Sequence, residues 1–304
     1  MKEDDFLEKL AAIATVQVRE PMLRHTSLRI GGPADFHVVA ESKEQLIQFL
    51  RLAHRAHMPF FLLGVGSNIL VSDLGIRGLV IENRTRRLER KEEPSSELVT
   101  LYAESGVTLA RLARETAREG LGGLEWAVGI PGTLGGAAIY NAGAYGGCIG
   151  DVLRSVEVIT PEGDILQLGT EELGLGYRRS NLRREQVILS LQLTLHRTPA
   201  EALKSRITQY TAQRHKSQPS QPSAGSVFKN PPKCAAGWLI EQAGLKGYRL
   251  GDAQISLKHA NFIVNLGRAK AAEVRALLQL AQEKVQERFN IHLEPEIELV
   301  GEWP

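Results

Sequence analysis

Apolar residues recur at helical spacing in several stretches of the chain. The clearest is 43–58, where Ser42 and Gln45 form a capping box, an apolar stripe follows and Pro59 ends the pattern. The same spacing predicts helices over 3–13, 109–119 and 274–289, and another helix is expected after Ala200. These helices are distributed along the whole chain.

Shorter apolar runs between turn residues predict strands. They lie at 60–63, 69–71, 79–81, 98–103, 156–160, 165–168, 187–195 and 294–300. The segment 161–164, Pro-Glu-Gly-Asp, is typical of a hairpin turn between two of them. In 187–195, apolar residues alternate with a second set, which predicts a strand with one buried face.

Glycine is concentrated in one part of the chain. Seven of the 29 glycines lie within 129–147. Glycine this dense marks backbone that takes positive φ or approaches a ligand closely. A flexible surface linker is the alternative, but linkers are polar and rich in serine, whereas apolar residues such as Ile130, Leu134 and Ile139 separate these glycines. The pattern favours a loop that holds a ligand.

A second glycine turn, Gly64-Val65-Gly66-Ser67-Asn68, follows the predicted strand 60–63. A Rossmann dinucleotide fingerprint requires a third glycine and a following helix, but here Ile69 occupies that position and strand-like sequence follows. The Rossmann interpretation therefore fails. The backbone N–H groups of such a turn can still form an anion-binding nest.

Composition narrows the classes of protein that remain. The chain has 304 residues, which suggests two or three domains, and a change of composition at Thr198-Pro199 marks a boundary. A net charge of +2 argues against a nucleic-acid binder, and two distant cysteines argue against a disulfide framework or a cysteine-rich zinc site. The sequence shows no membrane span, signal peptide or metal-binding constellation, so we expect a cytoplasmic protein without a metal.

Three polar residues are candidates for chemistry. Ser226 is either a reactive hydroxyl or a loop serine that caps a helix. Glu296 stands between apolar residues, where a carboxylate is costly unless it is paired or functional, and the alternative is an ion pair at a domain boundary. Arg178 follows Tyr177 after the glycine-rich half. These residues alone leave both interpretations open.

Taken in order, the motifs resemble a known family. They lie at 29–35, 64–68, 129–137, 141–146, 177–178, 225–231 and 293–296. Each motif is weak alone, but together they closely resemble the UDP-N-acetylenolpyruvoylglucosamine reductases, the MurB enzymes of peptidoglycan synthesis. The resemblance covers nearly the whole chain, from about Arg24 to Val300.

The resemblance implies an α+β protein with a vanillyl-alcohol-oxidase or PCMH-type FAD-binding fold. The implied domains are an N-terminal helical segment (1–25), an FAD-binding domain (26–198, with subdomains 26–85 and 86–198) and a substrate-binding domain (199–304). It further implies non-covalent FAD, NADPH as the reductant, and reduction of UDP-N-acetylglucosamine enolpyruvate to UDP-N-acetylmuramate. We expect a monomer that acts on small molecules and binds neither nucleic acid nor membrane.

The resemblance also assigns roles to residues. Arg178 and Glu296, the latter as the protonated acid, would stabilise negative charge on the substrate, and Ser226 would donate a proton. The implied FAD contacts are Gly64, Val65, Gly66, Ser67, Asn68, Ile69, Gly129, Ile130, Pro131, Gly132, Thr133, Gly135, Gly136, Ala137, Asn141, Gly143 and Arg214. The implied substrate contacts are Tyr177, Gln218, Lys229 and Asn230.

Two departures and two alternatives accompany this interpretation. Glu298 stands where shorter relatives often carry an arginine, and the passage from 187 to 200 has no room for the tyrosine-bearing insertion of the longer class, which indicates the shorter, type II form. One alternative is an oxidase on the same FAD fold, but no histidine or cysteine near the glycine loops is an obvious covalent flavin anchor. The other is a flavin- or nucleotide-binding regulatory module, which would be expected to have lost Ser226 or Glu296.

Overall fold

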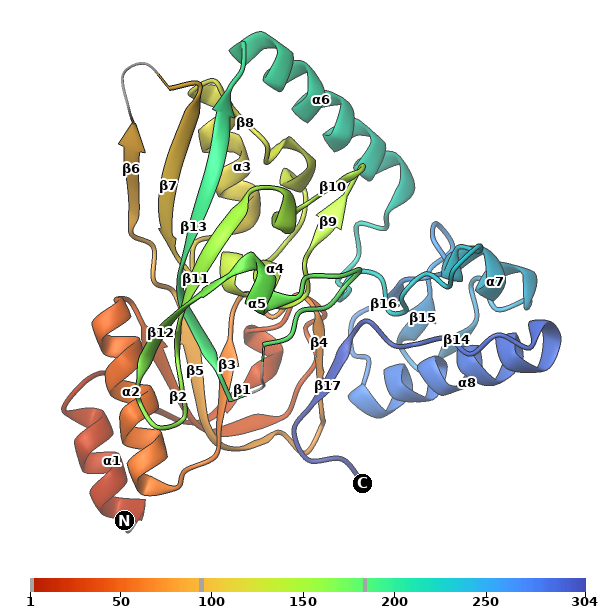
Figure 1. Ribbon diagram of the computed structural model, residues 1–304. Coiled ribbons are helices and arrows are strands. Elements are labelled where there is room, and N and C mark those ends of the chain that lie inside the picture. Colours follow the sequence, from red (N-terminus) through yellow and green to blue (C-terminus); the bar gives the residue numbers. More distant parts are fainter. Residues whose placement is uncertain (1–2, 93–95, 183–184) are drawn as a thin grey trace. The chain divides into compact units, whose positions relative to one another are not determined.

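The computed structural model describes residues 3–92, 96–182 and 185–304 (Figure 1). Its helices are α1 (Glu3–Ala11), α2 (Lys43–Ala56), α3 (Leu109–Arg118), α4 (Leu134–Ile139), α5 (Thr170–Leu173), α6 (Ala200–Ser217), α7 (Ala236–Gln242) and α8 (Ala271–Phe289). Short 3-10 helices lie at η1 (Met22–Arg24), η2 (Glu125–Ala127) and η3 (Ile149–Asp151). Each helix predicted from periodicity is present.

The strands follow most of the predicted apolar runs. They are β1 (Gln17–Pro21), β2 (Pro33–Ala40), β3 (Phe60–Leu63), β4 (Ile69–Val71), β5 (Ile76–Asn83), β6 (Leu88–Glu92), β7 (Leu98–Glu104), β8 (Leu121–Gly122), β9 (Gly143–Ala144), β10 (Gly147–Cys148), β11 (Leu153–Ile159), β12 (Ile165–Gly169), β13 (Val187–Arg197), β14 (Arg249–Leu250), β15 (Ala253–Ile255), β16 (Ile263–Asn265) and β17 (Glu298–Val300). The predicted hairpin is the antiparallel pair β11 and β12. The last strand is shorter than predicted, since it begins only at Glu298.

The chain forms two compact units. The first contains residues 1–17, 37–64 and 79–214, and the second contains 18–36, 65–78 and 215–304. The domain boundaries 1–25, 26–198 and 199–304 remain a prediction, because a division by spatial compactness does not test them.

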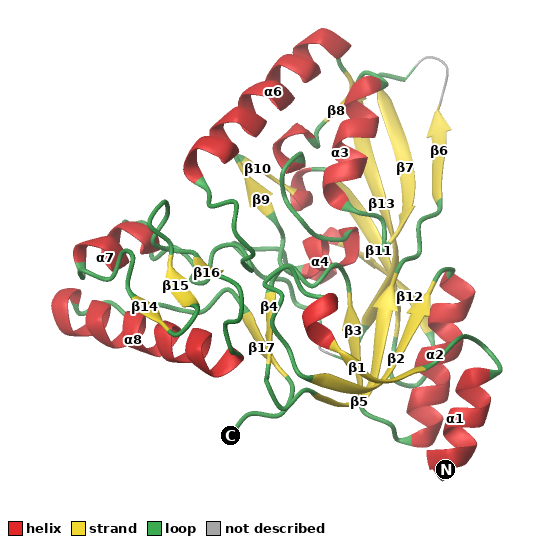
Figure 2. Ribbon diagram, turned by 180° about the vertical axis from the view of Figure 1, so that it is seen from behind, coloured by secondary structure: helices red, strands yellow, loops and turns green. Residues whose placement is uncertain are grey.

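In the first unit, strands β12, β11, β13, β7 and β6 lie side by side in that order, and β8 pairs with β13 (Figure 1). Helices α3 and α4 cover one face of this sheet, as Figure 2 shows from behind. Their apolar residues join those of β7, β11 and β13 in one core. Burial of this apolar area is the main force that holds the unit together.

The prediction of a single buried face for β13 is wrong in its first half. Val187 to Leu191 are all buried, including Ser190, whose hydroxyl donates a hydrogen bond to the Glu157 carboxylate at 3.3 Å. The Lys43 ammonium at the start of α2 in turn pairs with Glu157 at 2.7 Å. A strand in which apolar and polar residues alternate has a solvent-exposed face only where no other element packs on that face.

In the second unit, strands β14, β15 and β16 form a small antiparallel sheet beside α7 and α8 (Figure 1). Strands β4 and β17 pair in parallel, with Ile69 opposite Glu298. The Asp73 carboxylate, just after β4, accepts hydrogen bonds from the Ala271 and Ala272 amides and thereby caps α8. The glycine turn before β4 is thus attached to the main helix of this unit.

Strands β1, β2, β5 and β3 form a further sheet in that order, and β3 and β5 run parallel. Within the part of the chain that the structure describes, no helix is both long enough and apolar enough to cross a bilayer.

Candidate active site

The glycine-rich segment contains α4, a short helix that the sequence analysis did not predict. The Thr133 hydroxyl caps α4 by accepting a hydrogen bond from the Gly136 amide at 3.4 Å. The amides of Leu134 and Gly135 donate to backbone carbonyls in the loop after β7. The first donors of the helix are therefore already bonded within the protein, so the end of α4 is not a free anion site.

The backbone just before α4 fits the predicted cofactor site better. Among the described residues, no hydrogen bond engages the N–H of Gly132 or of Thr133. Gly64 lies against the same place, because a Cβ on Gly64 would stand 2.9 Å from the Thr133 hydroxyl oxygen. The first unit thus brings together parts of both predicted glycine loops, with amides available to a phosphate oxygen.

The rest of the Gly64 to Asn68 turn belongs to the second unit. Gly66 has φ +60°, and a Cβ there would stand 2.1 Å from the His25 carbonyl oxygen. The Gly66 carbonyl accepts a hydrogen bond from the Ser27 amide at 2.9 Å. Within the described chain, the N–H groups of Val65 and Gly66 have no hydrogen-bond partner. Only glycine fits this tight turn, and the free amides fit the pyrophosphate of a dinucleotide.

The other residues predicted to contact FAD differ in exposure. Val65 and Pro131 are exposed, Ser67, Ile130 and Asn141 are half-buried, and Ile69 and Ala137 are buried. Ile130 packs against the core of the first unit. Buried members such as Ile69 and Ala137 offer a ligand little beyond their backbone, so the predicted site depends on main-chain groups.

Asn68 links the glycine turn to Glu296. Its side-chain amide donates to the Glu296 carbonyl at 3.1 Å, and its own carbonyl accepts from the Glu298 amide at 3.0 Å. Both bonds lie where the parallel pairing of β4 and β17 begins, next to the Ile69 and Glu298 pair. The backbone of Glu296 is therefore fixed from the side of the cofactor turn.

Ser226 lies beside Glu296 along the backbone. The Glu296 amide donates to the carbonyl of Val227, the residue after Ser226, at 2.9 Å. Phe228 and Pro295 form an isolated antiparallel bridge, and the Lys229 amide donates to the Glu294 carbonyl at 2.9 Å. The second unit therefore brings two of the three predicted catalytic residues onto paired segments.

Arg178 is placed by a tight turn in the first unit. Gly176 and Arg179 exchange backbone hydrogen bonds at 3.1 and 3.3 Å, and Arg178 between them has φ +55°. The Arg178 guanidinium donates to the Gly143 carbonyl at 2.9 Å. The Asn141 side chain reinforces the turn by donating to the Gly176 carbonyl at 3.0 Å. An arginine held in the left-handed region is uncommon and is typical of functional turns.

Arg214 crosses the start of the glycine-rich segment. A Cβ on Gly129 would stand 2.4 Å from the Arg214 Cδ, so glycine at this position leaves room for the arginine side chain. Burial lowers the pKa of the Arg214 guanidinium from its usual value, although an arginine remains charged at neutral pH. A half-buried cation next to Gly129, at the start of the glycine-rich segment, suits an anionic ligand.

Helix α6 carries Arg214 on one face together with two anchors. Arg206, two turns earlier, forms an ion pair with buried Glu125 at 3.0 Å. Tyr210, one turn before Arg214, stacks on Tyr145 with ring centroids 4.4 Å apart and an angle of 5°. Residues at this spacing share a helix face, so the pair and the stack set the position of Arg214.

The predicted substrate contacts lie in both units. In the second unit, Lys229 pairs with Glu294 at 2.5 Å, the Asn230 side-chain oxygen accepts from the Ala236 amide at the start of α7, and Gln218 is half-buried. Tyr177, in the first unit, is 60% exposed. Lys229 and Asn230 thus have structural partners, and their contacts with substrate remain a prediction.

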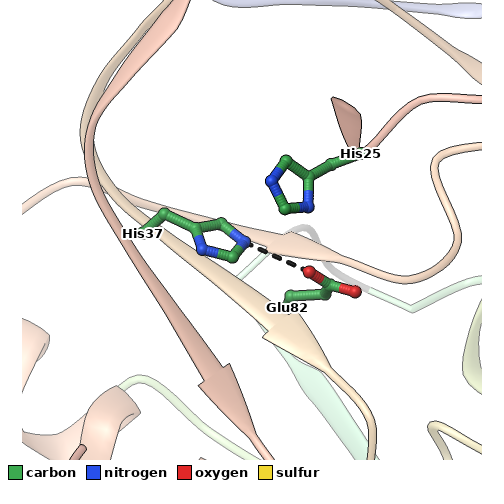
Figure 3. A group of neighbouring side chains, drawn as sticks. All are labelled: His25, His37 and Glu82. Atoms are coloured by element: carbon green, nitrogen blue, oxygen red, sulfur yellow. Dashed lines mark ion pairs between the residues drawn. The ribbon is translucent and has the colours of Figure 1, made fainter. Parts of the chain in front are cut away.

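A buried histidine that the sequence did not single out lies in β2. The His37 ring is fully buried, with one nitrogen 3.2 Å from the Glu82 carboxylate of β5 (Figure 3) and the other 2.8 Å from the Gln17 amide oxygen. Glu82 also pairs with Arg84 at 2.6 Å. These polar contacts tie neighbouring strands together, and the alternating pattern of β2 gave no sign of them.

Comparison with known proteins identifies the family. A family model for the C-terminal domain of UDP-N-acetylenolpyruvoylglucosamine reductase matches residues 218–300, and a model for an FAD-binding domain matches 34–169. The UDP-N-acetylenolpyruvoylglucosamine reductase of Syntrophomonas wolfei is 42% identical, covering 94% of this chain and 95% of that protein. The corresponding protein of Caldanaerobacter subterraneus is 42% identical over 98% of both.

This chain belongs to the UDP-N-acetylenolpyruvoylglucosamine reductase family. The crystal structure of the reductase (MurB) from Thermus caldophilus is also similar, with a TM-score of 0.79, 38% identity, and coverage of 96% of this chain and 100% of that one. The resemblance stated from the motifs is confirmed, as are the α+β class and the FAD-binding fold. Membership makes the chain an FAD-containing oxidoreductase of the MurB family.

The structure also bears on the two departures from the family pattern. Glu298 begins β17, where its amide donates to the Asn68 carbonyl. Only Thr198 and Pro199 separate β13 from α6, so this connection has no insertion, as expected of a type II MurB.

Proposed function

We propose that this chain reduces UDP-N-acetylglucosamine enolpyruvate to UDP-N-acetylmuramate, a peptidoglycan precursor. FAD, when bound, supplies hydride transfer from NADPH to the terminal carbon of the enolpyruvyl alkene. The observation that carries the proposal is the hydrogen bond between Glu296 and Val227, because it places Glu296 on a segment paired with that of Ser226. Family membership supports the same reaction.

The side chains of the protein act on the negatively charged substrate that remains after hydride transfer. Negative charge develops on the carbon next to the substrate carboxylate, and groups aimed at that charge contribute most to catalysis. Arg178, fixed by its turn and by the Gly143 carbonyl, supplies a permanent positive charge. Glu296 contributes in its protonated form, since a second negative charge would repel the developing one.

Ser226 donates the proton that completes the reduction. A serine is a weak acid, but a carbanion-like carbon is basic enough to take its proton when the hydroxyl is held at hydrogen-bond distance. Backbone amides of the predicted glycine loops, such as those of Gly132 and Thr133, would bind the FAD pyrophosphate. Asn230 would bind the nucleotide sugar, and Tyr177, Gln218 and Lys229 would make further contacts with the substrate. We expect the protein to act as a cytoplasmic monomer.

An anaerobic absorbance experiment tests the proposal. NADPH is expected to bleach the flavin band of the purified protein, and UDP-N-acetylglucosamine enolpyruvate is expected to restore it without oxygen. Recovery only after air is admitted would indicate an oxidase of the same fold. A protein that cannot be loaded with FAD would contradict the assignment of the glycine loops.

A further inference from the structure

Asn261 lies in the loop between β15 and β16 and is 3% exposed. Its side-chain oxygen accepts a hydrogen bond from the Phe228 amide at 3.0 Å, and its side-chain nitrogen donates to the Phe228 carbonyl at 2.8 Å. Its backbone carbonyl accepts from the Val227 amide at 2.9 Å. Asn261 thus holds the two residues that directly follow Ser226.

The opposite edge of this segment is held by the segment that carries Glu296. The Val227 carbonyl accepts from the Glu296 amide, and the Lys229 amide donates to the Glu294 carbonyl. A carboxamide offers the same donor and acceptor as a peptide group. The Asn261 side chain therefore supplies what a second neighbouring strand would supply, and the Ser226 segment is bonded along both edges.

Asn261 is itself held in place. The backbone N–H of Asn261 donates to the His259 ring nitrogen Nδ1 at 3.2 Å. Burial and the nearby Lys246 charge lower the pKa of His259, while Glu241 opposes this, so the ring remains a neutral acceptor at neutral pH. No part of this network is required by the chemistry assigned to Ser226 and Glu296.

We propose that Asn261 is a positioning residue for Ser226. Its carboxamide fixes the Val227 and Phe228 backbone, which sets the direction of the Ser226 hydroxyl relative to Glu296. The proposal deepens the proposed function and rests on the role of Ser226 as proton donor. Small misplacement of a reacting group is enough to slow a reaction by about 100-fold.

The test compares three variants in the two half-reactions, measured separately by anaerobic stopped flow. In Asn261→Ala, reoxidation of the reduced flavin by UDP-N-acetylglucosamine enolpyruvate should slow by about 10- to 100-fold, while reduction by NADPH changes less than about twofold. Asn265→Ala is the matched control. Asn265 is equally buried and bonds through both side-chain atoms, but to the Leu28 and Arg29 carbonyls and the Gly267 and Ala269 amides.

Ser226→Ala separates the proposal from the function on which it rests. If reoxidation slows in Ser226→Ala but not in Asn261→Ala, the positioning role is wrong and the reductase assignment stands. If reoxidation is unchanged in Ser226→Ala, the proton-donor role and the positioning role both fail. Equal slowing of both half-reactions in Asn261→Ala and in Asn265→Ala would reduce Asn261 to a structural residue.

A further measurement does not depend on turnover, and a second variant covers the case in which the alanine variant does not fold. Hydrogen exchange at the Phe228 amide should accelerate in Asn261→Ala relative to Asn265→Ala, and unchanged protection would overturn the proposal. Asn261→Asp serves if the alanine variant does not fold, because it keeps an acceptor for the Phe228 amide and loses the donor to its carbonyl. Relative to the native protein at the same pH, its reoxidation rate should recover in part as the pH is lowered, since the protonated acid regains a donor. Absence of recovery in a folded Asn261→Asp protein would contradict the positioning role.

Discussion

The glycine segments and the Ser226 and Glu296 segments build their sites in different ways. At Gly132, Thr133, Val65 and Gly66, the functional groups are backbone amides left without partners in the described structure. At Ser226 and Glu296, the predicted functional groups are side chains, and the backbone that directly follows Ser226 is hydrogen-bonded to Asn261 and to the segment that carries Glu296.

This difference follows from the ligand that each region is expected to hold. A pyrophosphate presents several oxygens to donors that can be spread along a loop, so a glycine turn suffices. A proton donor must reach one carbon from one direction, so its backbone has to be rigid. Substitutions in the first region should therefore impair FAD binding, and those in the second should impair chemistry after FAD is bound.

The largest effect is expected from Ser226→Ala. Loss of a general acid typically costs about 10²- to 10⁴-fold in rate, and only the reoxidation half-reaction should show it because proton donation occurs there. Stopped-flow absorbance measures both half-reactions. Ser220→Ala, at an exposed position between the end of α6 and Ser226, is the control. Equal slowing of both half-reactions in Ser226→Ala would contradict the assignment.

Gly66→Ala should impair the glycine segments and leave the Ser226 and Glu296 segments intact. An alanine would adopt φ +60° at a cost of about 1–2 kcal/mol and would also meet the His25 carbonyl, so FAD content and thermal stability should both fall. Gly244→Ala is the control that separates the steric contact from the backbone conformation. Gly244 has φ +80°, but the space around the position of its Cβ is open. Similar loss in both variants would show that conformation alone accounts for the effect.

Tyr210→Leu should weaken FAD binding modestly. The Tyr145 stack contributes about 1 kcal/mol beyond its buried area, which corresponds to about fivefold in affinity if the stack holds Arg214 at the glycine loop. Flavin fluorescence titration measures the dissociation constant. Tyr210→Phe keeps the stack, and it keeps the hydrogen bond from the Tyr145 hydroxyl because the acceptor is the Tyr210 backbone carbonyl. A matching loss in Tyr210→Phe would argue against the stack.

The two regions also differed in how far the sequence could predict them. The glycine loops were found from composition alone, because glycine density directly reflects a backbone requirement. Helix α4 within them cannot be predicted from periodicity, because its glycines obscure the apolar spacing and only the Thr133 cap indicates a helix. Alternation cannot predict the burial on both faces of the first half of β13, because that burial involves distant parts of the chain, such as Glu157, which bonds to Ser190 and pairs with Lys43.

Around Ser226, resemblance named the reactive residues but gave no account of what holds them. Asn261 is 33 positions from Phe228 in the sequence. No local sequence pattern connects two such residues. The sequence around a loop asparagine is the same whether its side chain caps a nearby turn or bonds to a distant segment. Only the fold reveals the pairing of Ser226 with Glu296 and its second support from Asn261.

The smallest expected effect concerns pH and the His259 ring. Because folding lowers the pKa of His259, the unfolded chain binds more protons below about pH 6.5, the ordinary histidine value, so stability should be full above that pH and decline as the pH falls through the lowered pKa. Urea unfolding of the native protein and of His259→Asn at several pH values measures this contribution. The difference between the two proteins in free energy of unfolding should shrink as the pH falls, since protonation removes the acceptor for the Asn261 amide. The reoxidation half-reaction should slow over the same range while FAD content is unchanged, because His259 supports the Ser226 region and not the glycine loops. Loss of FAD before loss of reoxidation would erase the contrast between the two regions.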